Sequence, residues 1–283
     1  MKKNKLAEIF ILLILFLICP FIEGQNIYNT ENSLKFADYL FKNQEYTMAA
    51  EEYERVVFLM PDSIMPKMHL IRSYHHAGQT QFAISRTEKF YPAIDQIEKP
   101  LARYYSKLLI LNNQFDKLTH TLKNNHFIPE KHKFFLNVSA ELYQKNWGKS
   151  SNMIKNSDKK LHLPEIAAYE KILKHTEDLN YKKPWISLGL STVIPGLGKA
   201  YSGYWKDGLF SFLVIGISGW QAYRGFDKNG IKSVYGWIMG SLGAGFYIGN
   251  LYGSYKAANK KNHDIDHEII EKVDAVFAGY SEN

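Results

Sequence analysis

The sequence predicts an all-α chain, in which an α-solenoid of repeated helix pairs is followed by a glycine-rich transmembrane helical hairpin. Two observations carry this prediction. Apolar and small residues recur at helical spacing with a period of about 34 residues, and after Lys183 the composition changes to apolar runs that contain glycine. With 283 residues, 46% hydrophobic and 22% charged, the chain has room for one large or two modest domains and is not disordered by composition.

Residues 1–24 are expected to form a secretory signal peptide. Lysines precede the apolar run of residues 9–18, and Pro20 and Gly24 close it, which is the order of an export signal. Because a spanning helix needs roughly 20 apolar residues, cleavage is favoured over a retained anchor. Cys19, the only cysteine, suggests a lipoprotein, but the small residues expected before a lipidated cysteine are missing. The cleaved chain would have no thiol for a disulfide, a zinc site or catalysis.

Residues 25–180 are expected to hold four helix pairs and a closing helix. The first pair places apolar and small residues at helical spacing: Phe36, Ala37, Leu40, Tyr46, Ala49, Ala50, Tyr53 and Val56. A shift of about 34 residues gives a matching set: Leu70, Ile71, Tyr74, Gly78, Ala83 and Phe90. Gly78 falls at the turn between two helices, where a residue without Cβ is useful. Later turns are predicted at 112–114 and 146–148, and the closing helix at 165–179.

This stretch resembles the tetratricopeptide-repeat family, most specifically in the first helix pair. The resemblance implies a TPR-like solenoid whose concave face binds an extended peptide or a partner helix. The candidate lining residues come from the inner helices: Lys35, Asp38, Tyr39, Lys42, His69, Arg72 and Arg103. The alternative is that these residues form a solvated polar face with no recognition role.

Residues 184–259 are expected to form a membrane module. The apolar runs 209–223 and 234–252, with their flanks, approach the length that crosses a bilayer. Aromatic and basic residues gather near the ends of these runs, as at a membrane interface. The earlier run, 185–197, is expected to be interfacial or re-entrant; three crossings, or a glycine-rich core without membrane contact, are the alternatives.

Glycines are spaced so that one side of the last apolar helix is bare backbone. The predicted helix-packing residues are Gly236, Gly240, Gly245, Gly249 and Gly253. We expect them to pack within the chain, against the preceding helix; a contact between two copies of the chain is the alternative. Gln221 and Asn250 are polar groups in the same runs, and burial requires that each be paired.

The string Pro195-Gly196-Leu197-Gly198 is the most distinctive in the chain. It continues as a predicted re-entrant turn whose residues are Pro195, Gly196, Gly198, Tyr201 and Gly203. This string is similar to the opening of the TM-two family and related two-helix membrane modules of Bacteroidetes, which implies a two-span hairpin. The chain departs from that family at Lys199-Ala200-Tyr201, where the family has a His-Arg-Phe-Tyr core. The resemblance implies no chemistry.

Residues 260–283 are expected to form an acidic amphipathic helix. Basic residues would favour anionic lipid, so an acidic polar face instead favours docking on protein, as a cap on the solenoid. His263 and His267 stand at i, i+4 spacing, which suits a shared metal, but solvated side chains are the plainer interpretation.

No catalytic motif is present: the sequence has no GxxxxGK[ST] loop, no His-Glu-x-x-His and no Gly-x-Ser-x-Gly. We therefore expect no enzyme, no cofactor and no metal site. The net charge of +7 is mildly basic and does not suggest nucleic-acid binding. The predicted function is a membrane-anchored scaffold or adaptor that binds another envelope protein or peptide through a periplasmic solenoid, with the inner membrane favoured. The alternative makes the hairpin the active part, as a small channel, transporter subunit or insertion helper.

Overall fold

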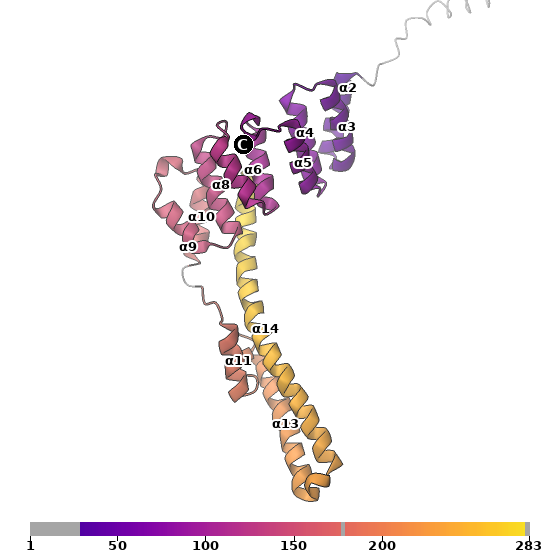
Figure 1. The fold of residues 1–283 in the computed structure, drawn as a ribbon, viewed down its shortest axis with the longest axis vertical. Coiled ribbons are helices and arrows are strands. Elements are labelled where there is room, and N and C mark those ends of the chain that lie inside the picture. Colours follow the sequence, from indigo (N-terminus) through magenta and orange to yellow (C-terminus); the bar gives the residue numbers. More distant parts are fainter. Residues whose placement is uncertain (1–28, 177–178, 281–283) are drawn as a thin grey trace, which may run out of the picture. The chain divides into compact units, whose positions relative to one another are not determined.

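The computed structural model describes residues 29–176 and 179–280, and every regular element there is helical (Figure 1). The predicted all-α class is confirmed. The predicted signal peptide, residues 1–24, lies outside the described residues. The chain divides into two compact units, Met1–Ile128 and Pro129–Asn283.

Helix pairs fill the first unit. Its elements are α2 (Thr30–Lys42), α3 (Tyr46–Leu59), α4 (Ile64–His76), α5 (Thr80–Phe90), the short η2 (Ile94–Gln96), α6 (Leu101–Leu111) and α7 (Phe115–Asn124). Ala37, Ala49 and Ala50 are fully or almost fully buried beside Tyr53 and Leu70. Alanine at these places lets the helix backbones approach closely, while the tyrosine and leucine fill the space between them. The arrangement is compatible with the predicted α-solenoid.

The same turn closes the first helix of four successive pairs. The residue at each turn has a positive φ: Gln44 (64°), Gly78 (77°), Asn113 (55°) and Lys145 (61°). After each one, the next amide donates back into the preceding helix, as Gln79 N does to Tyr74 O at 2.9 Å. This is the left-handed helix ending that glycine favours. It recurs at nearly the spacing predicted from the sequence pattern, so the pairs are structural repeats.

The second unit contains the fourth helix pair, a closing helix at Pro164–Lys174 and a glycine-rich helical region at residues 184–259. This region is called the hairpin below. Its elements are α8 (Glu130–Tyr143), α9 (Trp147–Lys155), η3 (Lys159–Leu161), α10 (Pro164–Lys174), α11 (Pro184–Val193), α12 (Leu197–Tyr201), α13 (Trp205–Asn229), η4 (Gly230–Lys232) and α14 (Val234–Gly279). Helix α14 is 46 residues long, so the boundary predicted at 259–260 falls inside one continuous helix. Its first part packs along α13 (Figure 1).

The last part of α14 packs on α8 and α10, where the predicted cap was expected. Phe277 and Tyr280 are almost fully buried there. The Phe135 ring of α8 lies 4.4 Å from the Tyr280 ring and stacks at 5.3 Å on Tyr169 of α10, measured between centroids. On the acidic side of the helix, Asp274 accepts a hydrogen bond from the Tyr143 hydroxyl. The tail therefore docks on protein, as its charge pattern predicted.

None of the described helices combines the length and mean hydropathy that crossing a bilayer requires. The predicted transmembrane hairpin is therefore not supported, although a glycine-rich helical hairpin is present. The reason lies in the composition of the two long helices. Helix α13 has Lys206 and Asp207 in its first turn and Lys228 in its last, and glycine, serine, tyrosine and tryptophan dilute the aliphatic residues of both helices.

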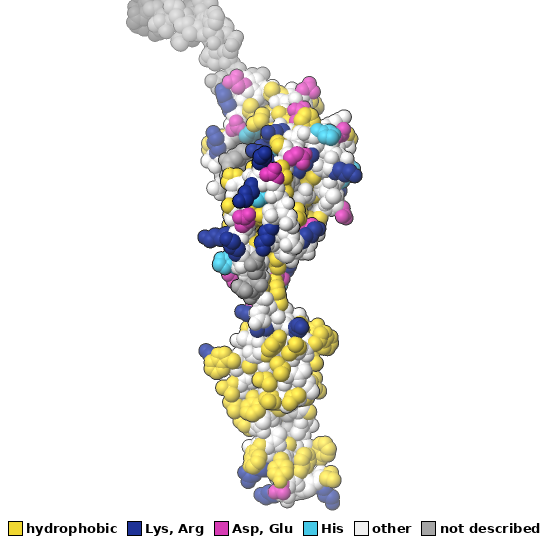
Figure 2. Space-filling view, turned by 90° about the vertical axis from the view of Figure 1, so that its left-hand side faces the viewer, with side chains coloured by type: hydrophobic (Ala, Val, Ile, Leu, Met, Phe, Trp, Pro, Cys, Tyr) yellow, Lys and Arg dark blue, Asp and Glu magenta, His cyan; other side chains and the backbone are white. Residues whose placement is uncertain are grey.

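The hairpin nevertheless exposes much apolar surface, and Figure 2 shows hydrophobic side chains gathered on it. Large side chains with more than half of their surface exposed include Trp185, Val193, Phe210, Ile217, Trp220, Trp237, Ile248 and Tyr252. Val193 is 80% exposed and Phe210 is 70% exposed. Contiguous apolar surface of this kind marks a site of contact with lipid or with another protein.

Candidate functional site

The candidate inner face is built around a buried tyrosine that joins three helices. The Tyr53 hydroxyl of α3 donates to Asp38 Oδ1 of α2 at 2.5 Å and lies 3.4 Å from His69 Nδ1 of α4. Tyr53 has no exposed surface. A buried phenol needs a partner for its O–H group, and two predicted candidates, Asp38 and His69, provide one. The apolar spacing in the sequence predicts only a core position for Tyr53, and it does not predict this second role of the hydroxyl.

Burial sets the protonation of this cluster. It raises the pKa of Tyr53 well above its ordinary value, and the bond to the Asp38 carboxylate raises it further. Burial also lowers the pKa of His69, opposed by Asp38 and assisted by the Arg72 charge. His69 is therefore neutral at pH 7. The remaining formal charges of the cluster are the Asp38 carboxylate and the Arg72 guanidinium.

Arg72 provides the cation of this face. Its buried Nε has no hydrogen-bond partner among the described residues, and it makes no ion pair there. The guanidinium lies over the Phe41 ring, 5.8 Å from the centroid. A cation–π contact holds the group in place but satisfies none of its five N–H donors. Arg72 can therefore still donate to a carboxylate.

The other predicted lining residues are less organised. Tyr39 is 62% exposed and stacks on Phe36 at 6.5 Å between centroids. Lys35 forms an exposed ion pair with Glu31, and Lys42 is exposed near the end of α2. Arg103 is partly buried on α6, a different helix from the three that meet at Tyr53. The structure thus brings together Asp38, His69 and Arg72, with Tyr39 nearby along α2.

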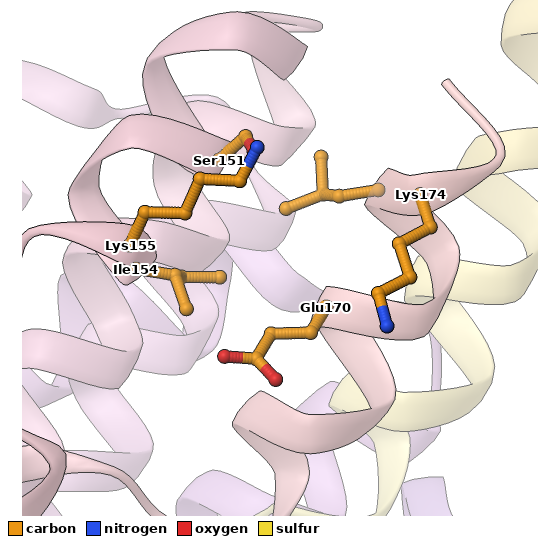
Figure 3. A pocket seen from close by; sticks show the side chains of 6 residues that line it. Ser151, Ile154, Lys155, Glu170 and Lys174 are labelled. Carbon is orange, nitrogen blue, oxygen red and sulfur yellow. The ribbon is translucent and has the colours of Figure 1, made fainter. Parts of the chain in front are cut away.

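A separate cavity of about 210 Å³ lies between α9 and α10 in the second unit (Figure 3). It is lined by Ser151, Ile154, Lys155, Glu170, Leu173 and Lys174. Lysine and glutamate side chains from the two helices border an apolar floor. Among residues 29–176 and 179–280, no group of three or more histidine, cysteine or acidic side chains could hold a metal. His263 and His267 stack at 6.1 Å, and His267 contacts Glu271 at 3.3 Å.

The predicted turn motif brings backbone segments into very close contact. Gly196 has φ +86°, and a Cβ there would lie 1.9 Å from the Gly208 carbonyl oxygen. A Cβ on Gly198 would lie 1.8 Å from the Ser187 carbonyl oxygen. Gly203 has φ +93°, and nothing lies within 4 Å of a Cβ built there, so only its backbone conformation favours glycine. Glycine is thus needed at 196 for both close contact and backbone conformation, at 198 for close contact, and at 203 for conformation.

Side chains form hydrogen bonds around these glycines. The Tyr201 hydroxyl accepts from Lys183 N at 3.3 Å, while Pro195 precedes the left-handed Gly196 at the start of α12. Gly198 N donates to Ser191 Oγ at 2.9 Å, and that oxygen lies 2.6 Å from Ser254 Oγ of α14. These hydrogen bonds therefore link α11 and α12 to α14.

The five predicted helix-packing glycines do not all pack against a neighbouring helix. A Cβ on Gly236 would lie 2.8 Å from the Phe226 ring, whereas one on Gly240 would meet Ala222 Cβ at an ordinary 3.8 Å. Gly245 and Gly249 have nothing within 4 Å. Gly253 lies against the Lys199 side chain, whose Cε would be 3.1 Å from a Cβ. Two of the five positions thus border open space, and the closest helix contacts occur at either end.

Comparison with protein-family models, curated proteins and solved structures finds no match to this chain. The resemblances to the tetratricopeptide-repeat and TM-two families remain predictions from the sequence.

Proposed function

We propose that this chain is a scaffold or adaptor that binds an extended segment of another protein on the inner face of its first two helix pairs. The observation that carries the proposal is Arg72, a partly buried cation with an unbonded Nε, held beside Asp38 and His69. Recognition of a carboxylate by an arginine held in this way is a common basis of peptide binding.

The surroundings indicate the chemistry of the bound segment. The stacked and exposed Phe36 and Tyr39 offer an apolar contact on α2, and Lys42 adds an exposed positive charge in the last turn of that helix. We infer a segment with an acidic side chain or a C-terminal carboxylate for Arg72, flanked by an apolar residue for the aromatic pair. The partner would be another protein of the cell envelope, since the N-terminal pattern favours export.

Site-specific crosslinking in cells tests this proposal. A photoreactive phenylalanine analogue replaces Tyr39 in the full chain, and crosslinked partners are identified by mass spectrometry. Arg72→Gln should reduce the specific crosslink about tenfold, because a charge-assisted hydrogen bond is lost. Lys89→Gln, which removes a charge from the exposed surface of α5, is the matched control and should leave the yield unchanged. Equal yields from all three proteins would refute the proposal.

We propose further that the hairpin attaches the chain to the surface of an envelope membrane, with the inner membrane favoured. Its exposed apolar side chains support this, as do the aromatic and lysine residues near its ends. Entry of apolar side chains into one leaflet requires no crossing helix.

Vesicle flotation tests the attachment. The full chain should float with vesicles of phosphatidylethanolamine and phosphatidylglycerol. Ile248→Asp places a charge at a side chain that is 67% exposed on the hairpin and should reduce flotation, whereas Phe58→Asp, at an 83% exposed side chain on α3, should not. A chain that stays at the bottom of the gradient, or floats equally with both substitutions, contradicts attachment through the hairpin. If the chain does not float but forms a dimer, a second copy of the chain covers the apolar surface of the hairpin instead of lipid.

A further inference from the structure

The hairpin contains a cavity of about 220 Å³ between α12, α13 and α14. Most of its wall is apolar, and three polar side chains come to it from three different helices. The lining residues are Lys199, Phe210, Ser211, Val214, Ile215, Gly245, Phe246, Gly249 and Asn250. The cavity thus has a mostly apolar wall with a few polar groups from converging helices, which is the pattern of a ligand site.

Asn250 is the polar group that the fold itself does not explain. Its side chain is only 3% exposed, and neither its amide nitrogen nor its amide oxygen has a hydrogen-bond partner among the described residues. The other amide side chain of these apolar runs, that of Gln221, accepts a bond from the Tyr235 hydroxyl at 3.1 Å. A buried amide without partners is costly unless something binds it, and Asn250 lines the cavity.

Lys199 brings a positive charge to the same cavity. Its Nζ donates to Ser211 Oγ at 2.8 Å, which uses one of three ammonium donors. Within the described part of the chain it forms no ion pair. Its stem crosses the bare backbone at Gly253, where a Cβ would come within 3.1 Å of Cε. The glycine at 253 therefore gives the lysine its path, and the charge is delivered to an apolar site without a counter-ion.

Gly245 and Gly249 help to make the space. Both line the cavity, and a Cβ on either would meet nothing within 4 Å. On the outer side, Phe210 is 70% exposed and Phe246 is 50% exposed. An apolar chain that leaves the cavity would therefore continue over the apolar surface of the hairpin.

We propose that this cavity binds an anionic group carried on an acyl chain, such as a long-chain carboxylate. Lys199 would neutralise the headgroup, Asn250 Nδ2 would donate to one of its oxygens, and the acyl chain would lie against Phe210, Ile215 and Phe246. A fatty acid and a lipid with a terminal phosphate share this chemistry. The site is independent of peptide binding by the repeats and is tested in detergent, without a partner protein or vesicles.

The experiment measures displacement of a fluorescent fatty acid, cis-parinaric acid, from the purified full chain. Oleate should compete saturably, and oleyl alcohol, which has the same chain without the charge, should compete about tenfold less well. Lysophosphatidic acid is the phosphate arm: stronger competition than oleate assigns the site to a lipid phosphate, and weaker competition assigns it to a free fatty acid. Equal competition by oleate and oleyl alcohol overturns the proposal.

Variants locate the binding. Lys199→Met should weaken oleate about tenfold and leave oleyl alcohol unchanged, whereas Lys206→Met removes an exposed charge outside the cavity and should change neither. Gly249→Leu should exclude both ligands. Gly216→Leu is its control, since that glycine also has nothing within 4 Å but does not line the cavity. Unchanged oleate affinity in both Lys199→Met and Gly249→Leu would place the ligand elsewhere and refute the site.

Discussion

Replacing Phe277 by alanine should separate the end of α14 from α8 and α10. Phe277 is 1% exposed, and its ring centroid lies 5.4 Å from that of Tyr143 and 6.1 Å from that of Phe135. The substitution removes a whole ring from a site enclosed by other rings. The surrounding helices cannot collapse into the gap without moving α14, so a cavity remains.

The expected loss in the free energy of unfolding is about 3–5 kcal/mol, the usual range for phenylalanine to alanine in a core. Two ring contacts, worth roughly 0.5–1.5 kcal/mol each beyond their buried area, favour the upper part of that range. For a unit of this size, each kcal/mol lowers Tm by roughly 2–4 °C. The melting transition of the second unit should therefore fall by about 6–20 °C.

The measurement is thermal unfolding in detergent, followed by circular dichroism, with hydrogen exchange to locate the change. Amides of α8, α10 and the end of α14 should lose protection together. Phe277→Leu keeps most of the volume and should cost less than about 1.5 kcal/mol, while Tyr252→Ala, at a 68% exposed side chain, should cost little. A loss below about 1 kcal/mol for Phe277→Ala would refute the tight packing of the cap.

Three further changes have defined outcomes. Gly198→Ala should destabilise the hairpin by several kcal/mol, about 3 or more, because its Cβ would overlap the Ser187 carbonyl oxygen; thermal unfolding measures this. Burial, with smaller contributions from neighbouring charges, lowers the pKa of His75 to about 4. The unfolded chain therefore binds the proton more tightly, and stability should fall by about 1–2 kcal/mol, after solvent screening, as pH drops from 6.5 towards 4; His75→Gln should lose this dependence. Glu54→Gln breaks the bidentate pair with Arg86 that links α3 to α5 and should cost about 1–2 kcal/mol in urea unfolding.

Matched variants make the results at Gly198 and Glu54 specific. Gly189→Ala adds a methyl group in α11 where nothing lies within 4 Å, and it should be tolerated. Glu51→Gln changes an exposed carboxylate on the same helix as Glu54 and should be neutral. If Gly189→Ala and Gly198→Ala unfold alike, the close backbone contact at Gly198 does not hold. If wild type and His75→Gln show the same acid dependence, His75 is not its source.

Periodicity in the sequence predicted the helix pairs because each pair repeats one pattern of small and large residues. It predicted the turn at Gly78 for the correct reason, since that residue has a positive φ. Gln44 and Lys145 adopt the same conformation without a residue type that announces it. There the packing of the two helices determines the turn and overrides local preference.

The hairpin shows where local reading fails. Apolar runs located α13 and the first part of α14. The length of these runs overestimated the mean hydropathy of the two helices, because glycine, serine and aromatic residues contribute less than aliphatic ones. Glycine spacing also did not distinguish positions that pack from positions that border a cavity. Gly236 touches Phe226, while Gly249 touches nothing. That difference depends on which residues lie opposite, which a single helix pattern does not contain.

The candidate inner face was predicted in part. Polar residues on the inner helices could be chosen by position, and Asp38, His69 and Arg72 do share one cluster. Their link is Tyr53, whose apolar ring satisfies the repeat pattern while its hydroxyl joins the cluster. A pattern that classes tyrosine as apolar cannot show both roles.

The continuity of α14 has a mechanical consequence. At 1.5 Å per residue, the 46 residues of α14 make a rod about 70 Å long. The helix has no break between Ser254, which bonds to Ser191, and Phe277, which packs beside α8 and α10. Helices bend gently and kink only at identifiable defects. A tilt or rotation imposed on one end is therefore delivered to the other. When the hairpin tilts or rotates on whatever it binds, α8 and α10 at the other end of α14 must move with it.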